Sequence, residues 1–102
     1  MANQRRFTVV MEPEEDGSYS VHCPALPGCV SQGDTREEAL ENIQEAILLV
    51  LAVMDEDGTP VPAETPEVIT EEIRHILKAR EEDSLPLTVE TIQVELPFEV
   101  PA

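Results

Sequence analysis

The chain has 102 residues, of which 22 are acidic and six are Lys or Arg, so its formal net charge is −16. This length predicts one domain with a single modest core. So few cations argue against direct nucleic-acid binding, which needs clustered contacts to phosphates. The charge either keeps a small protein soluble or attracts a basic partner, and composition leaves both roles open.

The sequence before the two cysteines shows no signal-peptide pattern, and no apolar run is long enough to predict a membrane span. No apolar segment follows Arg5 and Arg6 near the N-terminus. The longest apolar run, Ala46 to Met54, is far shorter than the ~20 residues of a membrane-spanning helix. We therefore expect a cytoplasmic protein in which Cys23 and Cys29 are reduced thiols.

The first third of the chain reads as three short strands. Residues 7–12 are rich in β-branched side chains, and a polar turn that contains Gly17 follows them. Residues 18–23 alternate, so that Tyr19, Val21 and Cys23 would face the core. The two prolines of the segment 24–28 indicate a corner, after which residues 29–32 resume as a strand. The first two strands are predicted to form an antiparallel hairpin.

The main helix is predicted to begin after Thr35 and to end near Met54 or Asp55, before Gly58. Thr35 and Glu38 fit a capping box, in which each residue can satisfy a backbone N–H group at the helix start. Apolar residues recur at helical spacing and form the face expected to cover the sheet: Ala39, Leu40, Ile43, Ala46, Ile47, Val50 and Leu51.

The second half of this helix is apolar outside that face as well. The additional residues are Leu48, Leu49, Ala52 and Val53. A helix that is apolar all round is buried all round. These four residues are therefore predicted to be covered by another part of the chain, by a second copy in a homo-oligomer, or by a partner.

A proline-rich connector at about 58–66 leads to a second helix at about 67–82. One face of that helix carries Ile69, Ile73, Ile76, Leu77 and Arg80. It is the first candidate for covering the apolar end of the main helix. A last strand follows from Val89 to Leu96, and Pro97 is expected to end it. The elements predict an α+β fold with two layers, β-β-β-α-(α)-β, in which one main helix covers an antiparallel sheet.

The sequence offers little for catalysis or cofactor binding. His22, Cys23 and Cys29 are potential metal ligands, but their spacing is not that of a zinc site. His22 and Cys23 would point to opposite faces of one strand, which disfavours a nucleophile and base pair. A residual metal-dependent nuclease would need acids such as Glu12 or Asp16 clustered on strands. We expect no enzymatic activity, no metal and no cofactor.

Several motifs follow one another in close order between about Phe7 and Leu51. They are Asp16-Gly17, Tyr19, Pro24-Ala25-Leu26-Pro27-Gly28-Cys29, Gln32-Gly33-Asp34-Thr35 and Glu37-Glu38-Ala39-Leu40-Glu41-Asn42. Together they resemble the signature of the HicB-like antitoxin family. The resemblance implies a partial ribonuclease H-like fold without a nuclease site. It also implies a partner, because family members bind and neutralise a small basic HicA-type toxin that cleaves RNA.

This resemblance suits the charge of the chain, because opposite charges speed the encounter of two proteins. The expected partner surface is the acidic turn and the outward face of the second strand: Glu14, Glu15, Asp16, Ser18, Ser20 and His22. The chain resembles a short form without the C-terminal DNA-binding domain of many members, and DNA contact through a complex stays open. The alternative is a stand-alone interaction domain, a homodimer or higher oligomer without a toxin.

Overall fold

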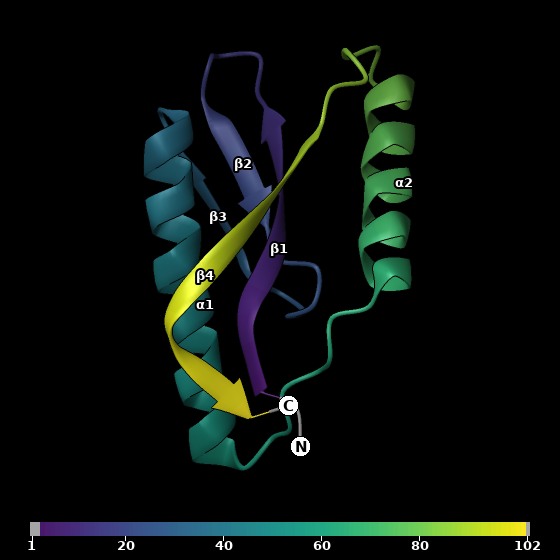
Figure 1. Ribbon diagram of the computed structural model, residues 1–102. Helices are drawn as coiled ribbons and strands as arrows, with labels where there is room; N and C mark the ends of the chain where they lie inside the picture. The colour runs from purple at the N-terminus through teal and green to yellow at the C-terminus, as the bar shows by residue number, and fades with distance from the viewer. Residues whose placement is uncertain (1–2, 102) are drawn as a thin grey trace.

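The computed structural model describes residues 3–101, and the side chains of residues 6–97. The elements follow in the order β1 (Asn3–Pro13), β2 (Tyr19–His22), β3 (Val30–Gly33), α1 (Arg36–Asp57), α2 (Pro66–Glu82) and β4 (Glu90–Pro101). The strands form one antiparallel sheet in the order β3-β2-β1-β4. The two helices lie on opposite sides of this sheet (Figure 1). The predicted α+β class and element order are confirmed.

Short backbone contacts build the hairpin and the corner that precede α1. The turn between β1 and β2 is closed by a hydrogen bond from the Glu14 N–H to the Ser18 carbonyl at 2.8 Å. Gly17 takes a φ of 88°, which favours glycine. At the corner, the Leu26 N–H donates to the Cys23 carbonyl and the Cys29 N–H donates to the Leu26 carbonyl, both at 3.0 Å. The corner therefore returns the chain directly beside β2.

Helix α1 begins with the predicted cap. Thr35 Oγ1 accepts the Glu38 N–H at 3.1 Å, and the Glu38 carboxylate accepts the Asp34 N–H at 3.4 Å. The helix continues to Asp57, slightly beyond the predicted end, and stops at Gly58, whose φ is 71°. Its four buried residues, Ala39, Ile43, Ile47 and Leu51, all belong to the predicted face.

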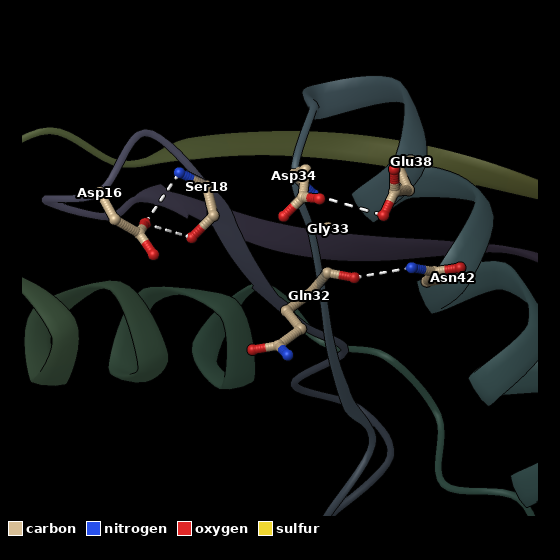
Figure 2. Close-up of a pocket in the computed structure, with 7 residues that line it drawn as sticks. All are labelled: Asp16, Ser18, Gln32, Gly33, Asp34, Glu38 and Asn42. Atoms are coloured by element: carbon tan, nitrogen blue, oxygen red, sulfur yellow. Dashed lines mark hydrogen bonds between the residues drawn. The ribbon is translucent and has the colours of Figure 1, made fainter.

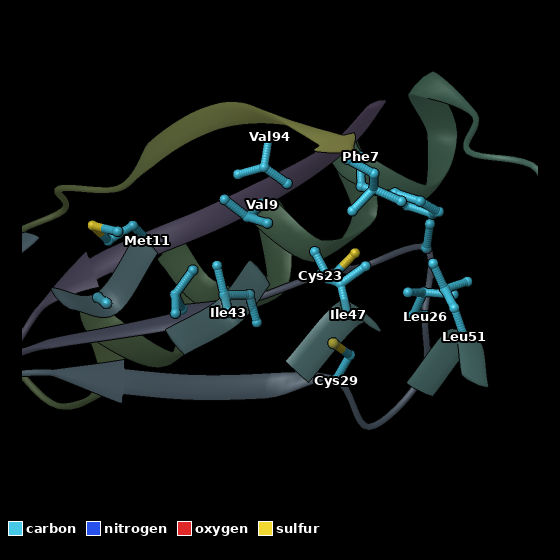
Figure 3. Close-up of a cluster of buried hydrophobic side chains, with 14 residues drawn as sticks. Phe7, Val9, Met11, Cys23, Leu26, Cys29, Ile43, Ile47, Leu51 and Val94 are labelled. Atoms are coloured by element: carbon cyan, nitrogen blue, oxygen red, sulfur yellow. The ribbon is translucent and has the colours of Figure 1, made fainter. Parts of the chain in front are cut away.

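The main core lies between α1 and the sheet. Alternate residues of β1 face α1, and side chains of β2, β4 and the corner complete the layer (Figure 3). The strand and corner members of this core are Phe7, Val9, Met11, Val21, Cys23, Ala25, Leu26, Cys29, Val94 and Leu96. Burying one such aliphatic side chain contributes about 1.5–3 kcal/mol, so this layer stabilises most of the fold.

The expected position of the second helix was wrong. Helix α2 does not cover the apolar end of α1; it lies against the other face of the sheet, where Arg80 contacts Glu12 of β1. The face is set by alternation, because Glu12 and the fully buried Val10 point away from the α1 side. The connector covers part of the end of α1 instead, since Val61 packs against the main core.

Strand β4 also runs further than predicted. Pro97 does not end it, and pairing continues to Asn3 with Pro101. The register shifts between Gln4 and Arg6, where β4 carries extra residues that include Pro97. Because β4 is an edge strand and the pairing is irregular at this point, the missing N–H of proline is tolerated.

Candidate functional site

An acidic pocket opens at the end of the sheet where the β1–β2 turn, the end of β3 and the start of α1 meet. Its volume is about 270 Å³, and it is lined by Asp16, Ser18, Gln32, Gly33, Asp34, Glu38 and Asn42. Figure 2 shows the side chains of Asp16 and Ser18 across from Asp34 and Glu38. Three of the seven lining residues are acids and none is a cation. The acidic pocket thus suits a positively charged group.

The close approach of α1 to β3 creates this pocket. Gly33 is buried, and a Cβ atom at this position would lie 2.4 Å from the backbone nitrogen of Ala39. Only glycine leaves room for the first turn of α1 to lie directly on the strand. The Asn42 side-chain amide donates to the Gln32 carbonyl at 2.7 Å and holds the helix to the strand. The acids at the helix start are thereby fixed beside the hairpin turn.

Asp16 is held in an ionised state by its neighbour. The Ser18 hydroxyl donates to Asp16 Oδ1 at 2.6 Å, and the Ser18 N–H donates to the same oxygen at 3.0 Å. These hydrogen bonds, chiefly the one from the hydroxyl, lower the pKa of Asp16 below its ordinary value. An aspartate is already ionised at neutral pH, and these bonds keep the Asp16 carboxylate, which lines the pocket from the turn, ionised to lower pH.

The six predicted partner-binding residues fall into two groups. Glu14, Glu15 and Asp16 lie exposed on the β1–β2 turn. Ser18 lines the acidic pocket with Asp16, while the Ser20 hydroxyl donates to Glu14 Oε1 at 2.7 Å.

His22 is separate from this group, because α2 covers the face on which it lies. Its Nδ1 is buried, has no hydrogen-bond partner and lies 3.6 Å from Glu72 Oε1 of α2. The structure thus brings five of the six residues together at the turn and places the histidine beneath α2.

Asp34, Glu38 and Asn42 were not predicted as site residues. Asp34 was interpreted as the end of the third strand and Glu38 as part of the helix cap, and the Glu38 carboxylate does accept the Asp34 N–H at the start of α1. The missing signal was spatial, because the hairpin turn and the helix start come together only through the β2–β3 pairing of Tyr19 with Gly33. The sequence does contain one signal for the pocket: Asp34 lies between Gly33, which ends a strand, and Thr35, which caps the helix.

The residues expected at an oligomer contact lie mostly on the surface. The side chains of Leu49 and Val53 are 68% and 55% exposed, and Ala52 is exposed beside them. Leu48 instead is half-buried and packs against the main core.

The described residues hold no group of three or more His, Cys, Asp and Glu side chains arranged to bind a metal ion. Cys23 and Cys29 are buried free thiols. None of the helices in the described part of the chain has the length and apolar character needed to cross a membrane.

Comparison with known proteins identifies the family of the chain. Residues 7–95 match the family described as the HicB-like antitoxin of bacterial toxin–antitoxin systems. A UPF0150 protein of Synechocystis is 52% identical over 58 residues, which are 57% of this chain and 73% of that protein. A UPF0150 protein of Thermoplasma acidophilum is 43% identical over 65 residues, 64% of this chain and 94% of the relative. Antitoxin HicB 1 of Photorhabdus laumondii is 41% identical over 61 residues, 60% of this chain but 39% of that antitoxin.

Solved structures share the fold. The N-terminal domain of the Burkholderia pseudomallei antitoxin HicB superposes with a TM-score of 0.63 at 24% identity, covering 91% of this chain and 99% of that domain. A chain of the HicA3–HicB3 toxin–antitoxin complex superposes with a TM-score of 0.60 at 16% identity, with the same coverage of 91% and 99%. The resemblance found in the sequence is confirmed, and the chain belongs to the HicB-like antitoxin family of bacterial toxin–antitoxin systems.

Proposed function

We propose that this chain is a cytoplasmic, non-enzymatic antitoxin that binds and neutralises a small basic RNA-cleaving toxin of the HicA type. Family membership and the net charge of −16 support this proposal. A structural neighbour is a toxin–antitoxin complex of HicA3 and HicB3. The observation that carries the proposal furthest is the acidic pocket, which collects Asp16, Asp34 and Glu38 on an exposed end of a chain of this family.

The binding surface in this proposal joins the acidic pocket to the acidic turn beside it. A lysine or arginine side chain of the toxin enters the pocket, and Glu14 and Glu15 meet further cations around it. A protein that cleaves RNA needs cations near its RNA-binding surface. An acidic protein that occupies those cations competes with RNA directly and needs no chemistry of its own. The encounter is steered by charge, so its rate falls as the salt concentration rises.

The experiment measures how strongly the chain inhibits the cleavage of RNA by the purified toxin. Wild-type chain is expected to stop cleavage at a one-to-one ratio. The triple variant Asp16→Asn, Asp34→Asn, Glu38→Gln should weaken binding by about tenfold or more, since one close interfacial charge pair contributes about 1.5 kcal/mol or more. These amides keep hydrogen-bond acceptors, so the turn and the helix cap are retained.

The matched control removes the same charge elsewhere. Glu67, Glu81 and Glu82 are exposed on α2, and their change to glutamine alters the net charge equally. The control variant should inhibit as the wild type does. Equal losses in both variants would show that overall charge alone matters, and an inactive wild type would overturn the proposal.

A second function is favoured by the exposed aliphatic surface of α1. Leu49 and Val53 are four residues apart and therefore share one face of the helix, with Ala52 beside them. In this alternative the chain is a stand-alone interaction domain that forms a homodimer through these residues and through Leu48, without a toxin. Sedimentation equilibrium tests it: the wild type should be a dimer at micromolar concentration and the Leu49→Lys, Val53→Lys variant a monomer. A monomeric wild type would exclude this second function.

A further inference from the structure

Cys23 and Cys29 occupy directly opposite positions at the end of the β2–β3 pairing. The register pairs Val21 with Ser31 and His22 with Val30, and the next pair is formed by the two cysteines. The Cys23 N–H donates to the Cys29 carbonyl at 2.9 Å. Both side chains are 2% exposed and belong to the main core (Figure 3).

This placement satisfies the backbone requirement of a disulfide. Residues opposite each other in antiparallel strands have Cα atoms about 4.5–5.5 Å apart. Disulfides are found at Cα separations of about 4.4–6.8 Å. Alternation puts both thiols on the same face of the sheet. The hydrogen bonds of Leu26 to Cys23 and of Cys29 to Leu26 close the corner between them, so the two backbones stay together. A bond between the sulfurs requires side-chain rotation rather than movement of a strand.

A cavity lies beside these two residues. Its volume is about 230 Å³, and its lining includes Cys23 and Cys29 together with His22, Pro24, Gly28 and Glu72. The opening lies between the corner and α2, on the side where α2 carries Glu72. Because both residues are only 2% exposed, a solute reaches the sulfurs only when the corner opens locally, and a small solute needs a smaller opening than a protein oxidant.

We propose that Cys23 and Cys29 form an oxidation site, at which a small hydroperoxide oxidises Cys29 and Cys23 then closes an intramolecular disulfide. In the first step the Cys29 sulfur takes the terminal oxygen of the peroxide, the O–O bond breaks, and the leaving oxygen takes the thiol proton as water or an alcohol. In the second step the Cys23 sulfur attacks the Cys29 sulfur, the S–O bond of the sulfenic acid breaks, and water leaves. The two sulfurs lose two electrons and the peroxide gains them.

The two cysteines have different roles because their surroundings differ. Hydrogen bonding from the Cys23 thiol lowers the pKa of Cys29, and the thiolate is the reactive form. The same interaction with Cys29, together with burial, raises the pKa of Cys23. Cys29 is therefore the residue that attacks the peroxide, and Cys23 is the residue that resolves the sulfenic acid. This site goes beyond the proposed antitoxin function and does not depend on it.

The test exposes the reduced, folded chain to hydrogen peroxide and follows its intact mass. The mass of the wild-type chain should fall by two hydrogen atoms, and no covalent dimer should form. Digestion should then yield two peptides joined by a disulfide between Cys23 and Cys29. In the Cys23→Ser variant the serine hydroxyl still donates to residue 29, but no disulfide forms, so dimedone should trap the sulfenic acid. The Cys29→Ser variant should capture less dimedone, because the remaining Cys23 thiol has a raised pKa and a smaller thiolate population.

Three results would overturn the proposal. The first is that disulfides form only between chains, and the second is that the two variants capture equal amounts of dimedone. The third is that the thiols of the folded wild type stay reduced at a peroxide concentration that oxidises the urea-unfolded chain. Circular dichroism establishes whether each variant folds. If a variant does not fold, the proposal is tested on the wild type instead, by measuring the fraction of disulfide after equilibration in glutathione redox buffers. The folded chain should favour the disulfide by about tenfold over the unfolded chain, a shift of about 30 mV, and an equal or smaller preference would contradict the proposal.

Discussion

The two faces of the sheet are held to their helices by different forces. On one face, α1 buries Ala39, Ile43, Ile47 and Leu51 against apolar side chains of the strands. On the other face, the seventeen residues of α2 bury only Ile76 and Arg80. Hydrophobic burial is non-directional, so a helix held by it tolerates small shifts in position. Hydrogen bonds depend on distance and angle, so a helix held by a few of them is fixed in one geometry.

The polar contacts on the α2 face concentrate at two points. Arg80, whose side chain is 5% exposed, donates to Glu12 Oε1 at 3.1 Å and to the carbonyls of Pro13 and Pro86. In the connector, Glu64 accepts the Thr8 N–H at 2.6 Å and the Thr8 hydroxyl at 2.8 Å. We therefore expect α1 and the sheet to form the stable part of the fold, and α2 to be a docked element that opens separately.

One matched truncation on each face of the sheet should show the largest difference between the two helices. Ile47→Ala should lower the free energy of unfolding by about 3 kcal/mol, because it opens a cavity among fully buried neighbours. Ile76→Ala should cost less than about 2 kcal/mol, since α2 can relax or undock before the whole fold is lost. Urea unfolding measures both. Equal losses would show that the two helices are integrated to the same degree.

Removal of the buried cation Arg80 should cause the next largest loss of stability. Arg80→Met leaves Glu12, whose side chain is 15% exposed, without its partner. Breaking a buried pair costs about 3–5 kcal/mol when the remaining charge stays buried, but undocking of α2 returns Glu12 to water. We therefore expect a loss of about 2 kcal/mol, with faster hydrogen exchange in α2 than in α1.

Arg74→Met is the control for that substitution, because Arg74 pairs with Glu71 on the exposed side of α2, where both side chains are 69% exposed. Such a surface pair contributes about 0–1 kcal/mol. If this variant accelerated exchange in α2 as much as Arg80→Met does, the buried contact would not be what docks the helix.

The two helix caps provide a smaller but closely matched pair. Thr35 Oγ1 accepts the Glu38 N–H at 3.1 Å, and Thr65 Oγ1 accepts the Val68 N–H at 3.3 Å. Thr35→Ala should lower global stability by about 1 kcal/mol, the usual value of an N-cap. Thr65→Ala should mainly speed hydrogen exchange within α2. Equal global losses measured by urea unfolding would contradict the view that α2 opens separately.

The smallest effect is expected at the ion pair that links α1 to β4. Arg36 Nη2 lies 2.8 Å from Glu90 Oε2, and hydrogen bonding from Arg36 lowers the pKa of Glu90 below its ordinary 4.5. The unfolded chain then binds this proton more readily, so the stabilisation is present above pH 4.5 and is lost as the pH falls through the lowered pKa. Wild type should exceed Glu90→Gln in stability at neutral pH, and the difference should disappear in acid. A difference that grew in acid would contradict this sign.

The sequence predicted the buried face of each helix more accurately than the part of the fold against which each helix packs. Apolar residues at helical spacing and the Thr35 cap identified α1 and its buried face, because both signals are local. The stripe that includes Ile76 and Arg80 identified α2, but the same stripe fits either side of a sheet. The deciding contacts join Arg80 to Glu12, far apart in the chain.

The candidate site shows the same limit. The acidic turn at Glu14 to Asp16 was evident from the sequence, because charge and glycine mark an exposed turn. The other wall of the acidic pocket, formed by Asp34 and Glu38, is brought there by the approach of α1 to Gly33. That approach depends on tertiary packing, which a single sequence does not display.

Hydrogen exchange of the full chain, measured with and without a basic HicA-type toxin, shows whether the acidic pocket binds the toxin. The acidic pocket is proposed to be the binding surface, so the toxin should slow exchange in residues 14–18 and 32–42. Exchange in α2 should stay as fast as in the free chain. Protection confined to α2 or to the exposed face of Leu49 and Val53, or no protection at all, would contradict the proposed role of the acidic pocket.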